Sequence, residues 1–492
     1  MSSLSSHCFT RLASRLPRLR WPSAFALAAV VATGCGGGGG AGTNFSGNTQ
    51  VTVLTTSTAN DQLTEFGGAL NTLTLTSQSG NRVSLLTSPA ALEFIHVNGR
   101  TEPLVTVSVP QGIYTSATIT TMGYTGFGCS TLENGYVSQP IWAYSSVPSS
   151  NITVTLPKPI TITGTSLGLL LDLLVSKSAI FGSCDGSVQA YSITPAFTIT
   201  PVAFVAQPTN SQNGKLSGLR GVVASINSDG SGISVNPLGG GPISPIWQAM
   251  LNGSTAFQGI AGASQLAVGL PVELDVTAQP DGSLLATRVE VYDTDTANLS
   301  FWYGGPLLKV SSADPEVIVS AAMESMGPIV LGFGSWFDFG GTRFQISKQL
   351  INLANLPFQT SFTAANMVAG QNVAVTMHDT SVGPNGPSAT TITLIPQTIN
   401  GTVNEISTEG EFTTFVVQLA PYDVFPTFAT QPNQTTVLTN PNTVVVYADS
   451  NTQKLNTIPI AVGSVARFYG LVFNDNGTLR MDCAQINDGV AE

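Results

Sequence analysis

Charged residues, histidines and long apolar runs are all scarce in this sequence. Only 9% of the 492 residues are Asp, Glu, Lys or Arg, against roughly 25% in an average soluble domain. Because 42% are hydrophobic, the chain is too apolar for intrinsic disorder, and it lacks the charge of a coiled coil. Helical periodicity is scarce, although residues 348–356 could form one or two turns. The composition predicts an extracellular, all-β protein whose surface is made of Ser, Thr, Asn and Gln.

Histidine limits the possible chemistry most. The chain has His7, His96 and His378, too few for a common zinc site without help from acids or cysteines. The motif GTSLG at residues 164–168 matches the serine elbow of α/β-hydrolases, which lies between a strand and a helix and needs a histidine partner. Strand patterns flank it on both sides here, so we interpret it as a hairpin loop. The sequence predicts no catalytic residue, no metal site and no cofactor.

An acidic stretch at residues 293–298 contains oxygen ligands of the kind that Ca²⁺ prefers, in Asp293 and Asp295. It lacks the glycine and the distant glutamate of an EF-hand loop. We interpret it as an acidic interdomain loop, and ion binding at these two aspartates stays open.

The first 35 residues have the order of an export signal. Four arginines precede a short apolar segment, residues 24–31, which is too short to span a bilayer. Residues 32–35 follow with the sequence ATGC, and small residues before a cysteine resemble the lipobox of bacterial lipoproteins. The resemblance implies cleavage before Cys35 and attachment of diacylglycerol to its thiol. The alternative is an ordinary secretory signal with a chance cysteine.

The residues after Cys35 predict a tether. Five glycines at 36–40 have no side chains to pack and form a flexible coil. Because Gly36 and not Asp follows the cysteine, the resemblance implies no retention at the inner membrane. We therefore expect an outer-membrane lipoprotein of the cell envelope, facing either the periplasm or the exterior.

The net charge argues against nucleic acid as a partner. Removal of residues 1–34, which hold four arginines and no acid, leaves 13 basic and 28 acidic residues, a net charge of −15. Such a surface repels phosphate backbones. No later run reaches 18 uninterrupted apolar residues, and the most apolar one, residues 167–175, contains Asp172. The lipid on Cys35 is thus the expected membrane contact.

Three cysteines remain after the signal and the anchor are set aside. We predict a disulfide between Cys129 and Cys184, because both fall in one proposed domain and an oxidising compartment permits the bond. Cys483 lies in a strand pattern, and we expect it to act as a free, buried, small apolar residue.

The first proposed domain has short alternating strand patterns, such as Leu63–Ser77 and residues 105–110. Between two of them, Pro110, Gly112 and Tyr114 predict a tight turn in which the tyrosine hydroxyl bonds to backbone. This P-x-G-x-Y turn recurs in transthyretin-like and immunoglobulin-like sandwiches. The stretch resembles a bacterial lipoprotein β-sandwich family of unknown function, which implies a β-sandwich.

The rest of the chain repeats. Residues 221–230 match residues 401–410 with Gly, Val, Ile and an acidic-Gly turn at identical spacing. A weaker copy starts at Gly305 and is expected to carry a long insertion between Pro315 and Gly341. Each copy has a later glycine that leads into a strand and then a hairpin turn. These later glycines are Gly269, Gly370 and Gly463, and the turns are Asp281-Gly282, Asn385-Gly386 and Asn476-Gly477. The copies are about 85–95 residues long, which is too long for the repeats of a solenoid. We predict three small β-barrels with five or six strands and a core each, of which the first and third resemble an OB-like lipoprotein barrel family of unknown function.

Alternation predicts which side chains fill the barrels. The inward residues are expected to be Val223, Val403, Val272 with Leu274, and Val373 with Val375. Ile226 and Ile406 join them only if a β-bulge intervenes. In the second copy, alternation puts Trp302 on the opposite face from Phe301 and Tyr303, so one of the two faces carries aromatic residues outside the barrel core. We expect that face to pack between domains rather than on a sugar.

The expected class is all-β, an N-terminal β-sandwich followed by three small β-barrel repeats. The predicted boundaries are residues 1–34 for the signal peptide, 35–50 for the tether, 51–206 for the sandwich, 207–216 for a linker, and 217–297, 298–398 and 399–492 for the barrels.

Two hypotheses of function stay open. The first is a non-catalytic, membrane-anchored surface lipoprotein for envelope scaffolding, adhesion or ligand binding. The second is an enzyme or accessory subunit acting on envelope or extracellular polysaccharide. The expected partners are the membrane, through Cys35, and a polysaccharide or an envelope protein. A cleft lined by two or more acids and exposed aromatic residues would favour the second hypothesis.

Overall fold

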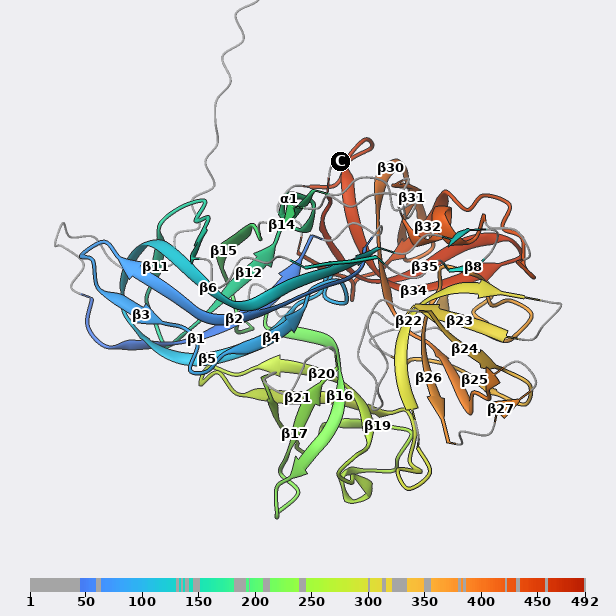
Figure 1. Ribbon diagram of the computed structural model, residues 1–492, viewed down its shortest axis with the longest axis horizontal. Coiled ribbons are helices and arrows are strands. Elements are labelled where there is room, and N and C mark those ends of the chain that lie inside the picture. Colours follow the sequence, from blue (N-terminus) through green and yellow to red (C-terminus); the bar gives the residue numbers. More distant parts are fainter. Residues whose placement is uncertain are drawn as a thin grey trace, which may run out of the picture. The chain divides into compact units, whose positions relative to one another are not determined.

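The computed structural model describes most of the chain from residue 45 to residue 490. Undescribed within that range are residues 59–62, 130–131, 134–135, 138–140, 145–150, 181–191, 194, 207–212, 239–244, 300, 312–315, 321–333, 349–354, 379–381, 384–385, 421–422, 431–433 and 456–458. The predicted anchor Cys35, Cys184 and the side chain of Cys129 lie outside the described part, as does most of the short helix expected at 348–356. Phe45–Glu492 forms one compact unit. Its strands, coloured in chain order in Figure 1, confirm the all-β class.

The N-terminal domain consists of two sheets. One has the order β15-β12-β1-β5, formed by β15 (Phe197–Val202), β12 (Ser166–Leu173), β1 (Asn48–Ser57) and β5 (Glu102–Pro110). The other is built on β2 (Leu63–Ser77) and β6 (Gly112–Cys129), to which β3 (Arg82–Ser84), β4 (Ala90–Glu93), β9 (Ile141–Tyr144), β10 (Asn151–Val154) and β11 (Ile160–Ile162) are added. Alternate residues such as Val51, Leu73 and Leu171 form a common core between them.

The predicted tyrosine turn is present between β5 and β6. Tyr114 is buried, and its hydroxyl donates to the carbonyl oxygen of Pro110 at 2.7 Å. Burial raises the pKa of this phenol. The turn is therefore fixed by one side chain that packs in the core and satisfies a backbone carbonyl.

The interpretation of residues 164–168 as a hairpin loop is wrong. β11 pairs with β6 in one sheet, whereas β12, which begins at Ser166, pairs with β1 in the other. The chain thus crosses from sheet to sheet, and Gly164, with φ of 78°, makes the bend. Ser166 is a strand residue, so the strand-to-helix setting of a hydrolase serine is missing at this point.

The first barrel is a closed sheet that is built around one long strand, β16. It is formed by β16 (Lys215–Ile226), β17 (Gly232–Pro237), β18 (Trp247–Met250), β19 (Ala256–Gln258), β20 (Pro271–Ala278) and β21 (Leu284–Val291). The order is β18-β17-β16-β20-β21-β19, and a parallel pairing of β18 with β21 closes it. The closed set excludes β19 and consists of the other five strands, which have the Greek-key arrangement of an OB-like barrel.

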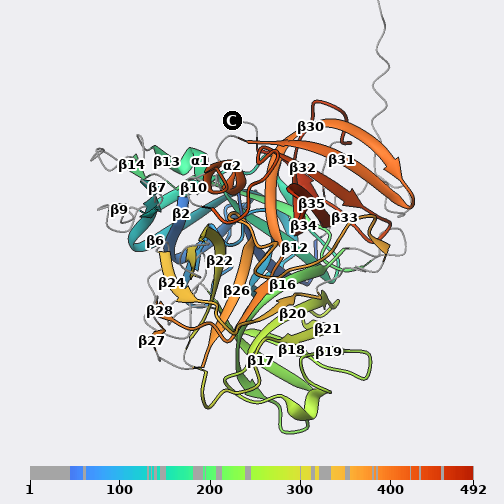
Figure 2. The same ribbon diagram turned by 90° about the vertical axis from the view of Figure 1, so that its right-hand side faces the viewer.

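The third barrel repeats this order strand for strand. Its strands are β30 (Gln397–Glu409), β31 (Phe412–Leu419), β32 (Thr443–Ala448), β33 (Gln453–Lys454), β34 (Val465–Asp475) and β35 (Thr478–Asp488), with β32–β35 as the closing pair. They are the strands labelled β30 to β35 at the upper right of Figure 2. At the predicted hairpin, Asn476 and Gly477 both have positive φ, 53° and 89°, as the turn requires.

The second barrel has the same order with a less regular course. It contains β22 (Phe301–Val310), β23 (Glu316–Ser320), β24 (Gly334–Asp338), β25 (Arg343–Ile346), β26 (Asn372–Met377) and β29 (Thr391–Leu394). The expected insertion between Pro315 and Gly341 in fact carries β23 and β24. The predicted hairpin at Asn385-Gly386 is a separate small one, β27 (Val382–Gly383) with β28 (Gly386–Pro387), whose turn residues are undescribed.

A backbone clasp repeats in all three barrels. In each, the later glycine donates its N–H to a carbonyl two residues after the start glycine. The three bonds are Gly269 to Val223 at 2.8 Å, Gly370 to Leu307 at 2.7 Å and Gly463 to Val403 at 2.7 Å. The acceptor residues are buried, and the pairing of the first two strands shifts by one residue directly after each of them. This is the bulge that Ile226 and Ile406 need to pack against their cores, as they do.

The predicted inward residues are confirmed, but one core is shared. Val272 and Leu274 lie in the first barrel's cluster, and Val373 and Val375 lie in the second's. That second cluster also contains Leu471 and Phe473, which belong to β34 of the third barrel. The second barrel therefore does not bury its core alone.

Helices are short throughout the described part. They are α1 (Val175–Ser178) and α2 (Val424–Phe428), and none is long and apolar enough to cross a membrane. The sequence did not predict α2, which begins at Asp423, whose carboxylate accepts from the Phe425 N–H at 3.1 Å. Cys483 is free and buried, as expected, and its Sγ lies 3.2 Å from the carbonyl oxygen of Gln485.

Candidate functional site

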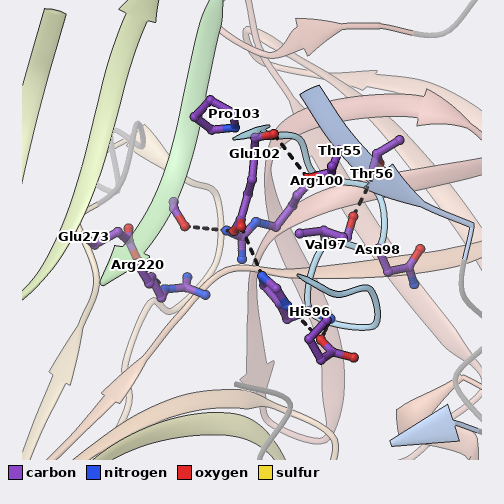
Figure 3. A network of polar contacts seen from close by, with 12 residues as sticks. Thr55, Thr56, His96, Val97, Asn98, Arg100, Glu102, Pro103, Arg220 and Glu273 are labelled. Carbon is purple, nitrogen blue, oxygen red and sulfur yellow. Dashed lines mark hydrogen bonds and ion pairs between the residues drawn. The ribbon is translucent and has the colours of Figure 1, made fainter. Parts of the chain in front are cut away.

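A loop between β4 and β5, residues 94–101, holds buried charges at the edge of the sandwich (Figure 3). His96 lies between two carboxylates, with Nδ1 at 2.7 Å from Glu93 and Nε2 at 3.1 Å from Glu102. Glu93 is fixed in turn, since its oxygens accept from three backbone N–H groups, those of Phe66, Ile95 and His96. We call residues 94–101 the junction loop.

The two carboxylates keep His96 charged. Burial alone would lower the pKa of this imidazole, but Glu102 and Glu93 outweigh it and raise the pKa to about 9. Burial likewise opposes ionisation of Glu102, yet His96 and Arg100 hold its pKa below the usual range. His96 and Glu102 are thus ionised at neutral pH although both side chains are almost fully buried.

Arg100 connects the junction loop to two barrels. Its guanidinium pairs with Glu102 at 3.1 Å and donates to the carbonyl oxygen of Gly218 in β16. It also lies over the ring of Tyr469 in β34, with the guanidinium carbon 5.7 Å from the ring centroid. The N–H of Gly218 donates to Asp275 at 3.1 Å, which extends the polar contacts into the first barrel.

A second cluster covers the outer face of three neighbouring strands of the first barrel. Glu273 accepts from Arg220 at 2.5 Å, from Arg288 at 3.1 Å and from the hydroxyl of Tyr292 at 2.7 Å. Arg288 also pairs with Asp275 at 2.7 Å. Burial opposes ionisation of Glu273, but the two arginines lower its pKa to about 2. The carboxylate is therefore ionised and fully buried.

Glu290 carries the polar contacts on to the second barrel. Its Oε2 pairs with Arg288 at 2.6 Å and accepts from the hydroxyl of Ser347 at 2.9 Å. Burial, and then the nearby charge of Glu273, raise the pKa of this carboxyl group. A second contact crosses at the same place, because Asp293 lies 2.5 Å from Nε2 of His378.

Glu290 and Asp293 line a cleft of about 590 Å³ between the first and second barrels. One wall is the end of β21 and the residues after it, with Glu290, Tyr292 and Asp293, and the other is β25, with Arg343 and Phe344. The Phe344 ring packs edge-on against Phe339 and Phe362. Carboxylates, a guanidinium, amides and a phenyl ring therefore share one opening of the size that small ligands occupy.

The acidic stretch that the sequence singled out thus lies at this cleft. Asp293 bonds to His378 and to the N–H of Asp295, and Asp295 bonds to Asn298. Within the described residues, no group of three or more His, Cys, Asp or Glu side chains is arranged to hold a metal ion. The interpretation as an interdomain loop fits these contacts.

The expected interdomain packing of one aromatic face is confirmed, and that face is the one with Trp302. Its ring packs with Tyr292 of the first barrel, at 5.4 Å between centroids, while Tyr303 lies in the core of the second. Sequence reasoning missed the charged residues of β16, β20 and β21, although their strict alternation with Val272, Leu274 and Val289 was visible.

The comparisons with known proteins assign one segment. Residues 220–290 match the model of a family described as a domain of unknown function (DUF5666), and this segment is most of the first barrel. Among solved structures, the chain is similar to one titled "drosophila Unr CSD456", with 10% identity over 56% of this chain and 98% of that chain and a TM-score of 0.13. No curated protein matches the chain.

Proposed function

We propose that the protein is a non-catalytic, membrane-anchored binding protein of the bacterial envelope that captures a neutral segment of polysaccharide. The observation that carries the binding assignment is the cleft of about 590 Å³ between the first and second barrels. The export signal, the lipobox-like residues before Cys35 and the glycine tether support the location.

The mixed lining of the cleft favours a neutral, hydroxyl-rich ligand. Sugar hydroxyls donate to carboxylates such as Glu290 and accept from a guanidinium such as Arg343. The half-buried ring of Phe344 offers an apolar face against which a sugar ring can lie. A strongly anionic ligand would meet Glu290 and Asp293 in the same opening, and a strongly cationic one would meet Arg343 and Lys348.

The engagement of the acids favours binding over catalysis. A glycosidase needs one carboxyl group as acid and a second as nucleophile or base. Glu290 accepts from Arg288 and from the hydroxyl of Ser347. Asp293 bonds to His378 and accepts from the N–H of Asp295. The raised pKa of Glu290 is the one feature that favours the second candidate, a hydrolase for the same polysaccharide.

Calorimetric titration of the Cys35→Ser protein with neutral oligosaccharides tests the proposal. We expect Arg343→Ala and Phe344→Ala each to weaken binding about tenfold, by the loss of a hydrogen bond to a charged group or of an apolar contact. Arg82→Ala, at an exposed arginine of the sandwich, is the matched control. Absence of binding, or equal affinity of all variants, would refute the cleft. Release of reducing sugar that Glu290→Gln abolishes would replace the binding function with the hydrolase.

A further inference from the structure

A separate cavity of about 200 Å³ lies among the sandwich, the start of β16 and the third barrel. Its lining combines apolar side chains, such as Leu170, Phe204 and Leu216, with polar ones, such as Asp172, Arg467 and Asn487. None of its lining residues belongs to the cleft between the first two barrels. Its occupant is therefore a different ligand.

Asp172 is placed at the cavity by strand alternation. Its neighbours in β12, Leu171 and Leu173, point into the sandwich core and are fully buried, so Asp172 and Leu170 lie on the opposite face of the sheet. In the described structure, Oδ1 of Asp172 is buried and has no hydrogen-bond partner. Burial raises the pKa of this carboxyl group, and the nearby charge of Arg467 compensates only in part. A buried carboxylate oxygen in this state is costly unless a donor reaches it.

Arg467 is the complementary charge. It is buried, and its guanidinium donates to neutral oxygens, namely the carbonyls of Asp488 at 2.9 Å and Ser57 at 2.8 Å, and Oδ1 of Asn98 at 3.3 Å. Burial lowers its pKa although Asp172 and Asp488 act against that change. The lining thus includes one carboxyl group, that of Asp172, and two basic groups, those of Arg467 and Lys215. Burial disfavours the charged form of both Asp172 and Arg467.

Water alone is a poor occupant of this space. A cavity of this volume holds roughly seven waters at about 30 Å³ each, and each buried water needs two to four polar partners. The side chains of Leu170, Phe204 and Leu216 in its lining offer no hydrogen-bond partner. A molecule with an apolar part and two opposite charges matches both kinds of lining residue.

We propose that this cavity binds a free amino acid with an apolar side chain, of about the size of leucine. Its ammonium group donates to Asp172, its carboxylate accepts from Arg467, and its side chain packs against Leu170, Phe204 and Leu216. The polysaccharide function proposed above is not needed for this site.

Calorimetric titration of the Cys35→Ser protein with L-leucine tests the proposal. Isoamylamine, which lacks the carboxylate, and 4-methylpentanoate, which lacks the ammonium group, are the two comparison ligands. We expect leucine to bind and each analogue to bind about 10- to 100-fold more weakly, as the loss of a hydrogen bond between charged groups implies.

Asp172→Asn separates binding from folding. The substitution removes a charge that burial disfavours and whose Oδ1 has no hydrogen-bond partner. The ligand-free variant should therefore melt at the same or a higher temperature than the parent, while leucine affinity falls about 10- to 100-fold. Asp229→Asn, the same change at an exposed hairpin turn of the first barrel, should alter neither property.

Three results would overturn the site: no heat of binding with leucine at millimolar concentration, equal binding of leucine and isoamylamine, or equal leucine affinity of Asp172→Asn and Asp229→Asn. Because the sugar titration uses another ligand and another set of variants, failure of the cleft leaves this result untouched, and the reverse also holds.

Discussion

Glu273→Gln is the substitution that probes the buried charges of the first barrel most directly. The glutamine keeps the shape of the side chain and removes its charge from between Arg220 and Arg288. An amide can still accept with its oxygen, but its NH₂ group then faces donors and leaves one of them unsatisfied. The variant therefore leaves two buried guanidinium groups with too little negative charge.

The size of the effect follows from the lowered pKa. A carboxyl group that shifts from 4.5 to about 2 on folding contributes about 3 kcal/mol of stability at neutral pH, at about 1.4 kcal/mol per pH unit. Breaking a buried ion pair by removal of one partner costs about 3–5 kcal/mol, which is the same order. Because the pKa is depressed in the folded state, this stability is fully present above pH 4.5 and is lost as the pH falls toward 2. The difference between parent and variant should shrink over that range.

Guanidinium chloride unfolding measures this difference. Tryptophan fluorescence reports on the relevant region, because Trp247 lies in the first barrel and Trp302 at its boundary. Glu411→Gln, at an exposed turn of the third barrel, should stay within about 0.5 kcal/mol of the parent. A loss below about 1 kcal/mol in Glu273→Gln, or a loss that does not change between pH 7 and pH 3, would falsify the assignment of Glu273 as an ionised partner of both arginines.

Three further predictions concern the repeat, the junction and the anchor. Gly221→Ala should destabilise the protein by about 1–3 kcal/mol in denaturant unfolding, because a Cβ there would lie 2.2 Å from the carbonyl oxygen of Asn236, whereas Gly253→Ala has open space and should cost nothing. Because folding raises the pKa of His96 to about 9, the stability that its charge provides should be fully present below pH 6.5 and be lost as the pH rises through 9. Unfolding measured across this pH range should show the loss in the parent and not in His96→Gln. Cys35→Ser should abolish fatty-acid labelling and release the protein from the membrane fraction, and unchanged fractionation would contradict the anchor.

The strands and the repeat could be predicted because local rules decide them. Val223 and Val403 face inward because alternation is fixed by the pleat. The later glycines, such as Gly269 and Gly463, indicate turns, because glycine adopts positive φ without strain. The tyrosine turn at Tyr114 likewise needs only neighbours along the chain. Each of these features depends on a few adjacent residues.

Features that depend on distant neighbours could not be predicted. Leu471 and Phe473 fill the core of the second barrel from a strand of the third, which no pattern within either copy indicates. The stretch predicted as an insertion in the middle copy contains β23 and β24, which pair with β22 and with each other in the strand order of the other two copies. The predicted disulfide between Cys129 and Cys184 involves side chains outside the described part of the chain, so it stays a prediction.

The charged residues of the first barrel show why the candidate site was missed. In β20, Glu273 and Asp275 alternate with Val272 and Leu274, which is the pattern of a strand with one solvated face. In the folded chain the polar face is buried as deeply as the apolar one, because the junction loop and the second barrel cover it. Alternation of polar and apolar residues shows only that one face of a strand points away from the core of its own barrel. It contains no information on whether water or another domain lies beyond that face, and in this protein that difference determines where the ionic clusters and the interdomain cleft are formed.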